Sequence, residues 1–380
     1  MAKKIFYASL SLLILVLIFL GAYNFAFKSN VNNPVADPVK KAEMQKANEA
    51  AITPPGNIES PLNENVMGAV ADKENSLYYF SLDDGSLKRA TLDGKSKTVL
   101  LSNLPGTPGR IVWSPKHDQV LLFLKQPSGA ALWYFSDINR KTLVPLKAEI
   151  SRPIWNNLGD KILYLFTDPK TKNRTLNIAN PDGSAWKKLT DLGPKDYFLA
   201  SVPQSSQVSF WNRPDGNETS SFQTVSTLGE NRHTLVSGTF GGDYLWSPNG
   251  EYALESGSDK QNGHVLTLSL LNATTGTVKN LSIPTLVSKT AWSGDGNTIY
   301  YALPGSLPSE AVLPNDYYGK PLFTKDTFWK MDRETGKSTR LVELKEITAG
   351  LDSTDFFLSP KEDFLYFTDR VTKRLFRLEL

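Results

Sequence analysis

Few residues of this chain have the types and spacing that catalysis or metal binding requires. The three histidines, His117, His233 and His264, are far apart, and no local pattern joins them to a metal site or a Ser-His-Asp set. The absence of cysteine excludes disulfides, thiolate metal sites and cysteine nucleophiles. No Gly-x-Ser-x-Gly motif occurs, so the nucleophile elbow of serine hydrolases is missing. The residues therefore predict no catalytic centre, no metal site and no cofactor.

One stretch combines aromatic and charged side chains in a predicted loop. Residues 303–325 hold four prolines together with Asp316, Tyr317, Tyr318 and Lys320. Loops of this kind form binding surfaces when a rigid scaffold positions them, although an ordinary surface loop can have the same composition. Which surface the loop joins depends on the elements around it.

A recurring pattern organises those elements. It consists of an apolar residue (usually Trp), then Ser and Pro or close substitutes, a polar turn, and four or five apolar residues. Its copies begin at Val70, Trp113, Trp155, Ser201, Trp246, Trp292 and Leu358. Successive copies are 42–46 residues apart, except that the last interval is 66. A period of about 40–50 residues with several short strands in each unit is typical of a β-propeller blade.

Each unit carries predicted strands separated by turns rich in Asp, Asn and Gly. In the second unit the strands cover residues 110–113, 119–125, 131–138 and 141–146. No convincing helix follows residue 65, so the predicted fold class is all-β. We expect a β-propeller of four-stranded blades over residues 66–380, with seven blades favoured and six as the alternative. The last unit supplies three strands, and residues 57–65 are a candidate for its fourth, which would leave no unpaired edge there.

Strand direction predicts where the proline-rich loop lies. In an up-and-down blade, the loop between the second and third strands is on the same face as the links between blades. Residues 303–325 therefore share a face with the residues that enter the innermost strands. Together they predict a binding surface at the axial mouth, formed by Arg110, Arg152, Asp196, Tyr197, Asp243, Tyr244, Asp316, Tyr317, Tyr318 and Lys320.

The units resemble the TolB-like, WD-repeat-like family of β-propeller repeats, which read roughly Pro-x-Trp-Ser-Pro-Asp-Gly before an apolar strand. The pattern is closest at residues 152–155 and 180–190, in Trp-Ser-Pro-Asn-Gly at 246–250, and in Ser-Gly-Asp-Gly at 293–296. It departs in Pro-Lys-His at 115–117 and Pro-Lys-Glu at 360–362. The resemblance covers about residues 66–380 and implies the fold. Since such propellers include both binders and hydrolases, it implies no single function.

The amino terminus has the pattern of a membrane anchor. Lys3 and Lys4 precede an uncharged run, residues 5–27, which is long enough to cross a bilayer that needs about 20 residues. Basic residues before the run place the amino terminus in the cytoplasm and the body outside. Residues 28–65, with five prolines, are expected to be a flexible tether. The alternative is a cleaved signal peptide, which the lack of a small-x-small site disfavours.

The nearly balanced charge of the chain limits which partners can be expected. Lys and Arg number 42 against 39 Asp and Glu, so there is no electrostatic reason to expect nucleic acid. The sequence favours a membrane-anchored, extracytoplasmic β-propeller that binds a protein or an envelope polymer through its axial face. The alternatives are an enzyme, such as a hydrolase or lactonase acting at the axial pocket, and a passive subunit of an envelope assembly.

The predicted boundary between anchor and body is testable by deletion. We expect removal of residues 1–27 to give a soluble, folded protein, because the remaining chain has no comparable apolar run. Circular dichroism and size-exclusion chromatography without detergent would measure this. Persistent aggregation of the shortened chain would contradict the boundary.

Overall fold

The computed structural model describes residues 58–305, 307–347 and 350–380. These residues belong to one compact unit, Ala47–Leu380. The predicted anchor, residues 1–27, and most of the predicted tether lie outside the described residues. Among the residues that are described, no helix is long and apolar enough to span a membrane.

Antiparallel strands form nearly all of the regular structure. Within the described residues they make five four-stranded sheets and one seven-stranded sheet. The first three sheets in chain order are β2 (Val66–Ala71), β3 (Ser76–Ser81), β4 (Ser86–Thr91) and β5 (Lys97–Leu101); β6 (Thr107–Trp113), β7 (Gln119–Lys125), β8 (Ala131–Asp137) and β9 (Thr142–Pro145); and β10 (Ile150–Trp155), β11 (Ile162–Thr167), β12 (Arg174–Ala179) and β13 (Lys187–Gly193).

The seven-stranded sheet follows, and it contains an unusually long strand. Its strands are β14 (Tyr197–Ser201), β15 (Gln207–Asn212), β16 (Thr219–Ser226), β17 (His233–Trp246), β18 (Tyr252–Ser258), β19 (Thr267–Asn272) and β20 (Val278–Ile283). The first half of β17 pairs with β16 and its second half with β18, with a bulge between Phe240 and Asp243. Gly241, at φ +63°, lies in this bulge, where a residue with a side chain would be strained.

The last two sheets complete the ring. One consists of β21 (Thr290–Trp292), β22 (Thr298–Leu303), β23 (Thr327–Asp332) and β24 (Ser338–Arg340). The other consists of β25 (Ser353–Leu358), β26 (Phe364–Asp369), β27 (Leu375–Glu379) and β1 (Ile58–Glu59). In it β1 pairs with β27, Ile58 opposite Leu378 and Glu59 opposite Arg377. Both ends of the described chain thus share one sheet.

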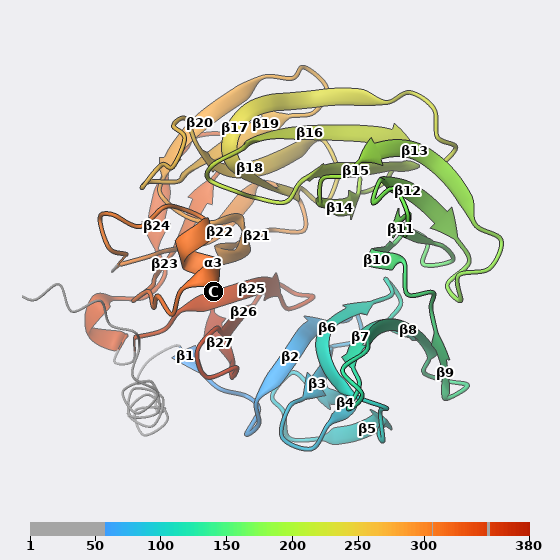
Figure 1. The fold of residues 1–380 in the computed structure, drawn as a ribbon. Helices are drawn as coiled ribbons and strands as arrows, with labels where there is room; N and C mark the ends of the chain where they lie inside the picture. The colour runs from blue at the N-terminus through green and yellow to red at the C-terminus, as the bar shows by residue number, and fades with distance from the viewer. Residues whose placement is uncertain (1–57, 306, 348–349) are drawn as a thin grey trace, which may run out of the picture. The chain divides into compact units, whose positions relative to one another are not determined.

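The sheets are arranged around a central axis (Figure 1). First strands of neighbouring sheets contact each other, as β2 does with β6 and β25, β10 with β14, and β21 with β25. Each sheet buries its faces against the two beside it, because a four-stranded sheet cannot bury both faces alone. The core consists of apolar clusters in which neighbouring sheets meet, such as β2–β5 with β6–β8.

The recurring Trp residues join each repeat unit to the unit before it. The indole N–H of Trp113 donates to the carbonyl oxygen of Gly68 at 2.8 Å, and that of Trp155 donates to the carbonyl oxygen of Val112 at 3.0 Å. Trp246 donates to the Oγ of Ser209 at 2.9 Å. In the fourth unit Ser201 replaces Trp, and its hydroxyl donates to the Trp155 carbonyl at 2.7 Å. The repeat therefore encodes the packing of each unit against the unit before it.

The structure differs from the sequence prediction in one element of the 303–325 loop. A single helical turn, α3 (Asn315–Gly319), forms there, although no helix was expected after residue 65. The 3₁₀ turns η1 (Val287–Lys289) and η2 (Leu344–Glu346) are similarly short. Pro314 directly precedes α3, a position that suits the fixed φ of proline and its lack of an N–H.

Truncating one of these Trp side chains tests the packing. Trp246 is buried among Phe222, Tyr244 and Leu271, so Trp246→Ala should lower the free energy of unfolding by about 3–5 kcal/mol. Chemical denaturation would measure the change. Trp186→Ala is the matched control, because that indole is mostly exposed and its loss should change stability little.

Candidate functional site

Bulges in the innermost strands bring special backbone positions to the axis. The pairing with the second strand shifts at one point in β2, β10, β17 and β25. The residue at each bulge has a positive φ: Gly68, Arg152, Gly241 and Asp355. Glycine adopts this conformation freely, but a residue with a Cβ is strained by about 1–2 kcal/mol. Arg152 and Asp355 carry charged side chains at these positions in spite of that cost. Strain retained at charged positions marks a candidate functional site.

Arg152 is held in place from two sides. Its guanidinium donates to both carboxylate oxygens of Asp196, at 2.7 and 3.2 Å. It also lies over the ring of Phe198, 4.3 Å from the ring centre. Burial opposes the charge of Asp196, but the bonds from Arg152 outweigh it and keep the pKa of Asp196 below its usual value. This pair is therefore ionised and rigid at neutral pH.

The loop between β22 and β23 lies across the same face and is fixed at two places. The Asn315 amide donates to the Asp215 carboxylate at 2.7 Å, and its oxygen accepts the Gly216 backbone N–H at 2.8 Å. A Cβ on Gly241 would lie 2.5 Å from Pro314, so glycine is needed there for close approach as well. At the second place, the Tyr318 hydroxyl bonds with the Ser288 hydroxyl at 3.2 Å.

A buried charge cluster anchors the base of this loop. Lys289 is fully buried, and its ammonium lies 2.6 Å from Asp326 and 2.8 Å from Asp352. Asp352 also accepts from the Tyr317 hydroxyl at 2.7 Å and pairs with Arg370 at 2.7 Å. Burial alone would raise the pKa of Asp352, but Lys289, Tyr317 and Arg370 hold it below its usual value. Removing one partner would leave a buried charge uncompensated, so the cluster fixes the loop firmly.

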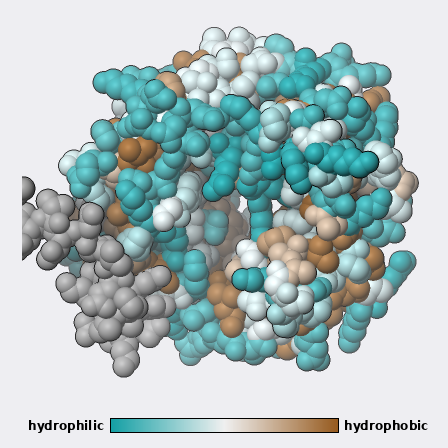
Figure 2. Space-filling model, in the orientation of Figure 1, coloured by the Kyte–Doolittle hydropathy of each residue, from teal (hydrophilic) through white to brown (hydrophobic). Residues whose placement is uncertain are grey.

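These elements enclose what we call the axial cavity, with a volume of about 960 Å³. Its lining is polar and carries charges of both signs, from three basic and four acidic side chains. The lining residues are Arg152, Lys195, Asp196, Phe198, Asn212, Arg213, Pro214, Asp215, Glu218, Asp243, Ser288, Asn315, Tyr318 and Gly319. Figure 2 shows hydrophilic residues gathered around a central hollow on the face that carries α3.

Two charged residues of the cavity differ from the rest: Asp243 has a raised pKa, and the Arg213 guanidinium has no partner among the described residues. Burial raises the pKa of Asp243 to about 6, although the Trp211 indole N–H donates to it at 3.0 Å. The Arg213 guanidinium forms no hydrogen bond or ion pair with another described residue. Lys195 and Glu218, by contrast, pair with each other at 2.8 Å. Arg213 is thus the cation of the lining that a ligand could contact without breaking an existing pair.

Arg110 and Asp355 lie near this cavity without lining it. Both side chains are accessible to water, yet burial shifts the pKa of each, because protein surrounds them on several sides. Desolvation and the charge of Arg152 lower the pKa of Arg110, while Asp355 opposes the shift. Burial raises the pKa of Asp355.

The structure brings together four of the ten residues that the sequence suggested. Arg152, Asp196, Asp243 and Tyr318 line the axial cavity. Tyr197 and Tyr244 are in the core, where their hydroxyls donate to the Leu192 carbonyl at 2.9 Å and to Glu255 at 2.7 Å. Successive strand residues point to opposite sides, so a tyrosine next to an aspartate of the lining must point away.

The remaining members of that set have other roles. Tyr317 is fully buried and anchors the loop through Asp352. Asp316 and Lys320 form an ion pair of 2.8 Å within the loop and are absent from the lining.

Sequence reasoning missed the contribution of one further loop. Residues 212–219 join β15 to β16 and supply Arg213, Asp215 and Glu218 to the lining. This is also a connection between second and third strands, so the rule that placed residues 303–325 on this face applies to it equally. The described residues contain no group of three or more His, Asp and Glu placed to hold a metal ion.

The fold is that of a β-propeller. An oligogalacturonate lyase in complex with manganese is similar to it, with a TM-score of 0.61 and 13% identity over 86% of this chain and 94% of that one. The β-propeller domain of Cps50 (Swd1) from Myceliophteria thermophila has a TM-score of 0.56 and 9% identity, over 85% and 99% of the two chains. TolB from Acinetobacter baumannii matches more weakly, with a TM-score of 0.46 and 13% identity over 91% and 70%.

The fold predicted from the repeat and from its TolB-like, WD-repeat-like resemblance is therefore confirmed as a β-propeller. At these identities the likeness concerns the fold and carries no activity across. No protein-family model matches the chain, and no curated protein matches it in sequence.

The raised pKa of Asp243 makes a prediction about stability and pH. Between about pH 4 and 6 the folded protein keeps a proton on Asp243 that the unfolded chain has lost, so stability falls as pH rises. Each pKa unit corresponds to about 1.4 kcal/mol. Asp243→Asn should therefore gain on the order of 3 kcal/mol relative to wild type between pH 3.5 and 7. Urea unfolding of both proteins at these two pH values would measure this, and a constant difference would contradict the assignment.

Proposed function

We propose that this protein is a membrane-anchored, extracytoplasmic β-propeller that binds a protein partner through the axial cavity. The proposal includes seven blades, since β17 serves as the outer strand of one four-stranded unit and the inner strand of the next. The run of residues 5–27 and the lysines before it support the anchor and its orientation.

The observation that carries the binding proposal is the construction of the cavity. The loop carrying α3 holds an exposed Tyr318 at one opening, and the β15–β16 loop, to which Asn315 is bonded, presents an unpaired Arg213 there. Tyr and Arg are the residues that most often dominate binding energy at protein interfaces. A rigid, prearranged surface also loses little entropy on association.

The mixture of charges favours a polypeptide over a polymer with one repeated charge. Three basic and four acidic side chains line the cavity. A polymer of uniform charge would face like charges on part of this lining, whereas a peptide presents both signs and a backbone with donors and acceptors.

Site-directed photo-crosslinking in the source cells tests the proposal. A photo-reactive amino acid at Tyr318 or Arg213 of the full chain should give the same crosslinked protein band, identified by mass spectrometry. The control position is Leu158, an exposed residue in the β10–β11 turn, which lies on the opposite face of the propeller. Equal labelling from Leu158, or no protein adduct from either cavity position, would contradict a protein-binding role for this face.

A hydrolase or lactonase is the second candidate, and one observation favours it. Asp243 has a pKa of about 6 and lines the same cavity as Tyr318, so it would be an effective general base near neutral pH. Turnover of a lactone or ester panel that Asp243→Asn abolishes would favour this candidate.

A further inference from the structure

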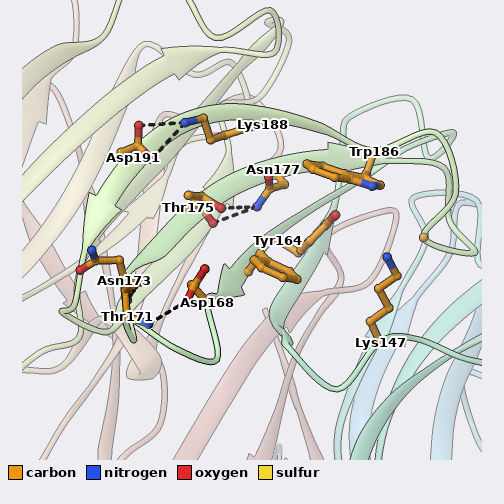
Figure 3. A pocket seen from close by; sticks show the side chains of 12 residues that line it. Lys147, Tyr164, Asp168, Thr171, Asn173, Thr175, Asn177, Trp186, Lys188 and Asp191 are labelled. Carbon is orange, nitrogen blue, oxygen red and sulfur yellow. Dashed lines mark hydrogen bonds and ion pairs between the residues drawn. The ribbon is translucent and has the colours of Figure 1, made fainter.

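A second pocket lies on the face of the third sheet, away from the axis. Figure 3 shows this side pocket, which has a volume of about 390 Å³. Register explains its floor: Tyr164, Asn177 and Lys188 are paired across β11, β12 and β13, and so are Phe166, Thr175 and Asp191. Paired residues on neighbouring strands point to the same face. The rim consists of Lys147, Asp168, Thr171, Asn173, Gly183 and Trp186.

Two buried polar side chains in the floor present unpaired atoms to this pocket. Asn177 is 1% exposed, and its Nδ2 donates to the carbonyl oxygen and the hydroxyl of Thr175, at 3.1 and 2.8 Å. The carbonyl must accept, so the amide orientation is fixed and Oδ1 is the free atom. Tyr164 is 3% exposed, and its hydroxyl has no hydrogen bond to any described residue.

These two atoms are open to the pocket rather than sealed in the core. Neither belongs to the buried, unpartnered polar atoms of the described residues. In Figure 3 the Tyr164 hydroxyl points toward the indole of Trp186. Both atoms can therefore exchange hydrogen bonds with a polar ligand that occupies the pocket. Burial raises the pKa of Tyr164, which keeps its hydroxyl protonated and able to donate.

An exposed aromatic platform stands at the rim. Trp186 is 58% exposed, whereas the Trp residues at positions 113, 155, 246 and 292 are at most 9% exposed. The turn before it has a fixed backbone: the Gly183 N–H donates to the Asn180 carbonyl, and Asp182 accepts from the Ser184 N–H, both at 2.9 Å. An exposed indole offers a large flat apolar surface.

The charges of the lining indicate a neutral ligand. Two lysines, Lys147 and Lys188, balance two aspartates, Asp168 and Asp191. Lys188 pairs with Asp191 at 3.0 Å, and Asp168 accepts the backbone N–H groups of Lys170 and Thr171. The Lys147 ammonium, in contrast, has no partner among the described residues and lines the same pocket as Tyr164.

We propose that the side pocket binds a neutral saccharide. The apolar face of a pyranose ring stacks on Trp186 while its hydroxyl edge faces the floor. One sugar hydroxyl donates to Asn177 Oδ1, another exchanges a hydrogen bond with the Tyr164 hydroxyl, and a third accepts from Lys147. A ring with one apolar face and an edge of hydroxyls that both donate and accept meets the platform and both unpaired atoms together. This site is separate from the axial cavity and does not depend on the function proposed there.

Saturation-transfer NMR on the full chain tests the proposal. The protein is held in a detergent without a sugar headgroup, such as lauryldimethylamine oxide, and probed with millimolar cellobiose, maltose and N,N′-diacetylchitobiose. We expect transfer to the ring protons of at least one of them. Trp186→Ala should weaken its binding by about tenfold or more, the equivalent of about 1.4 kcal/mol. Tyr164→Phe, which removes only the hydroxyl, should weaken it several-fold.

Tyr318→Ala is the matched control, because it removes an exposed aromatic ring from the axial cavity and leaves the side pocket intact. It should leave saccharide binding unchanged, so failure here and failure of the axial proposal are distinguishable. No transfer to any of the three sugars from the wild-type protein would overturn the proposal. Equal binding by wild type and Trp186→Ala would overturn it as well.

Discussion

The rest of this structure depends on the contact between each sheet and the one before it. A four-stranded sheet has two faces to bury and only neighbouring sheets to bury them against. The indole N–H bonds from Trp113 and Trp155 to carbonyl groups of the preceding innermost strand fix the distance and the angle of that contact. With this relation repeated, the innermost strands are brought around an axis, and their bulges face one another there.

The rigidity of the axial cavity follows from that arrangement. Arg152 is strained, but its bonds to Asp196 and its stacking on Phe198 keep it in one orientation. The loop carrying α3 is fixed by Asn315 on one side and by the Lys289 cluster below. A buried ion cluster is weak evidence for overall stability, since its desolvation is costly. Its contribution here is to hold one loop in one position.

Much of the fold could be predicted from the sequence, because the period of the repeat and the turn residues report local structure directly. Three of the four strands predicted in the second unit agree with β7, β8 and β9 within one residue at each end. The first, predicted from Arg110, begins earlier, at Thr107, because a bulge interrupts its pattern. Bulges also change which side chains face the axis, and this limited the prediction of the site.

The side-chain partners of the site were less predictable for a different reason. Lys289, Asp326 and Asp352 are far apart in the sequence, and each one alone has the appearance of a surface charge. They form a buried cluster only because the fold brings three separate segments of the chain into contact. The same holds for Asn177 and Tyr164, whose unpaired atoms become visible once cross-strand register places them on one face.

The closing strand has a mechanical consequence. The described chain enters the ring at β1, so tension applied to the residues before Ile58 reaches the propeller first through the pairing of β1 with β27. That pairing is short, but Ile58 and Leu62 are buried and Glu59 forms an ion pair with Arg377. Pulling from the amino terminus would load the sheet that joins the two ends, and the ring would open there, between its first and last strands, before any other sheet came apart.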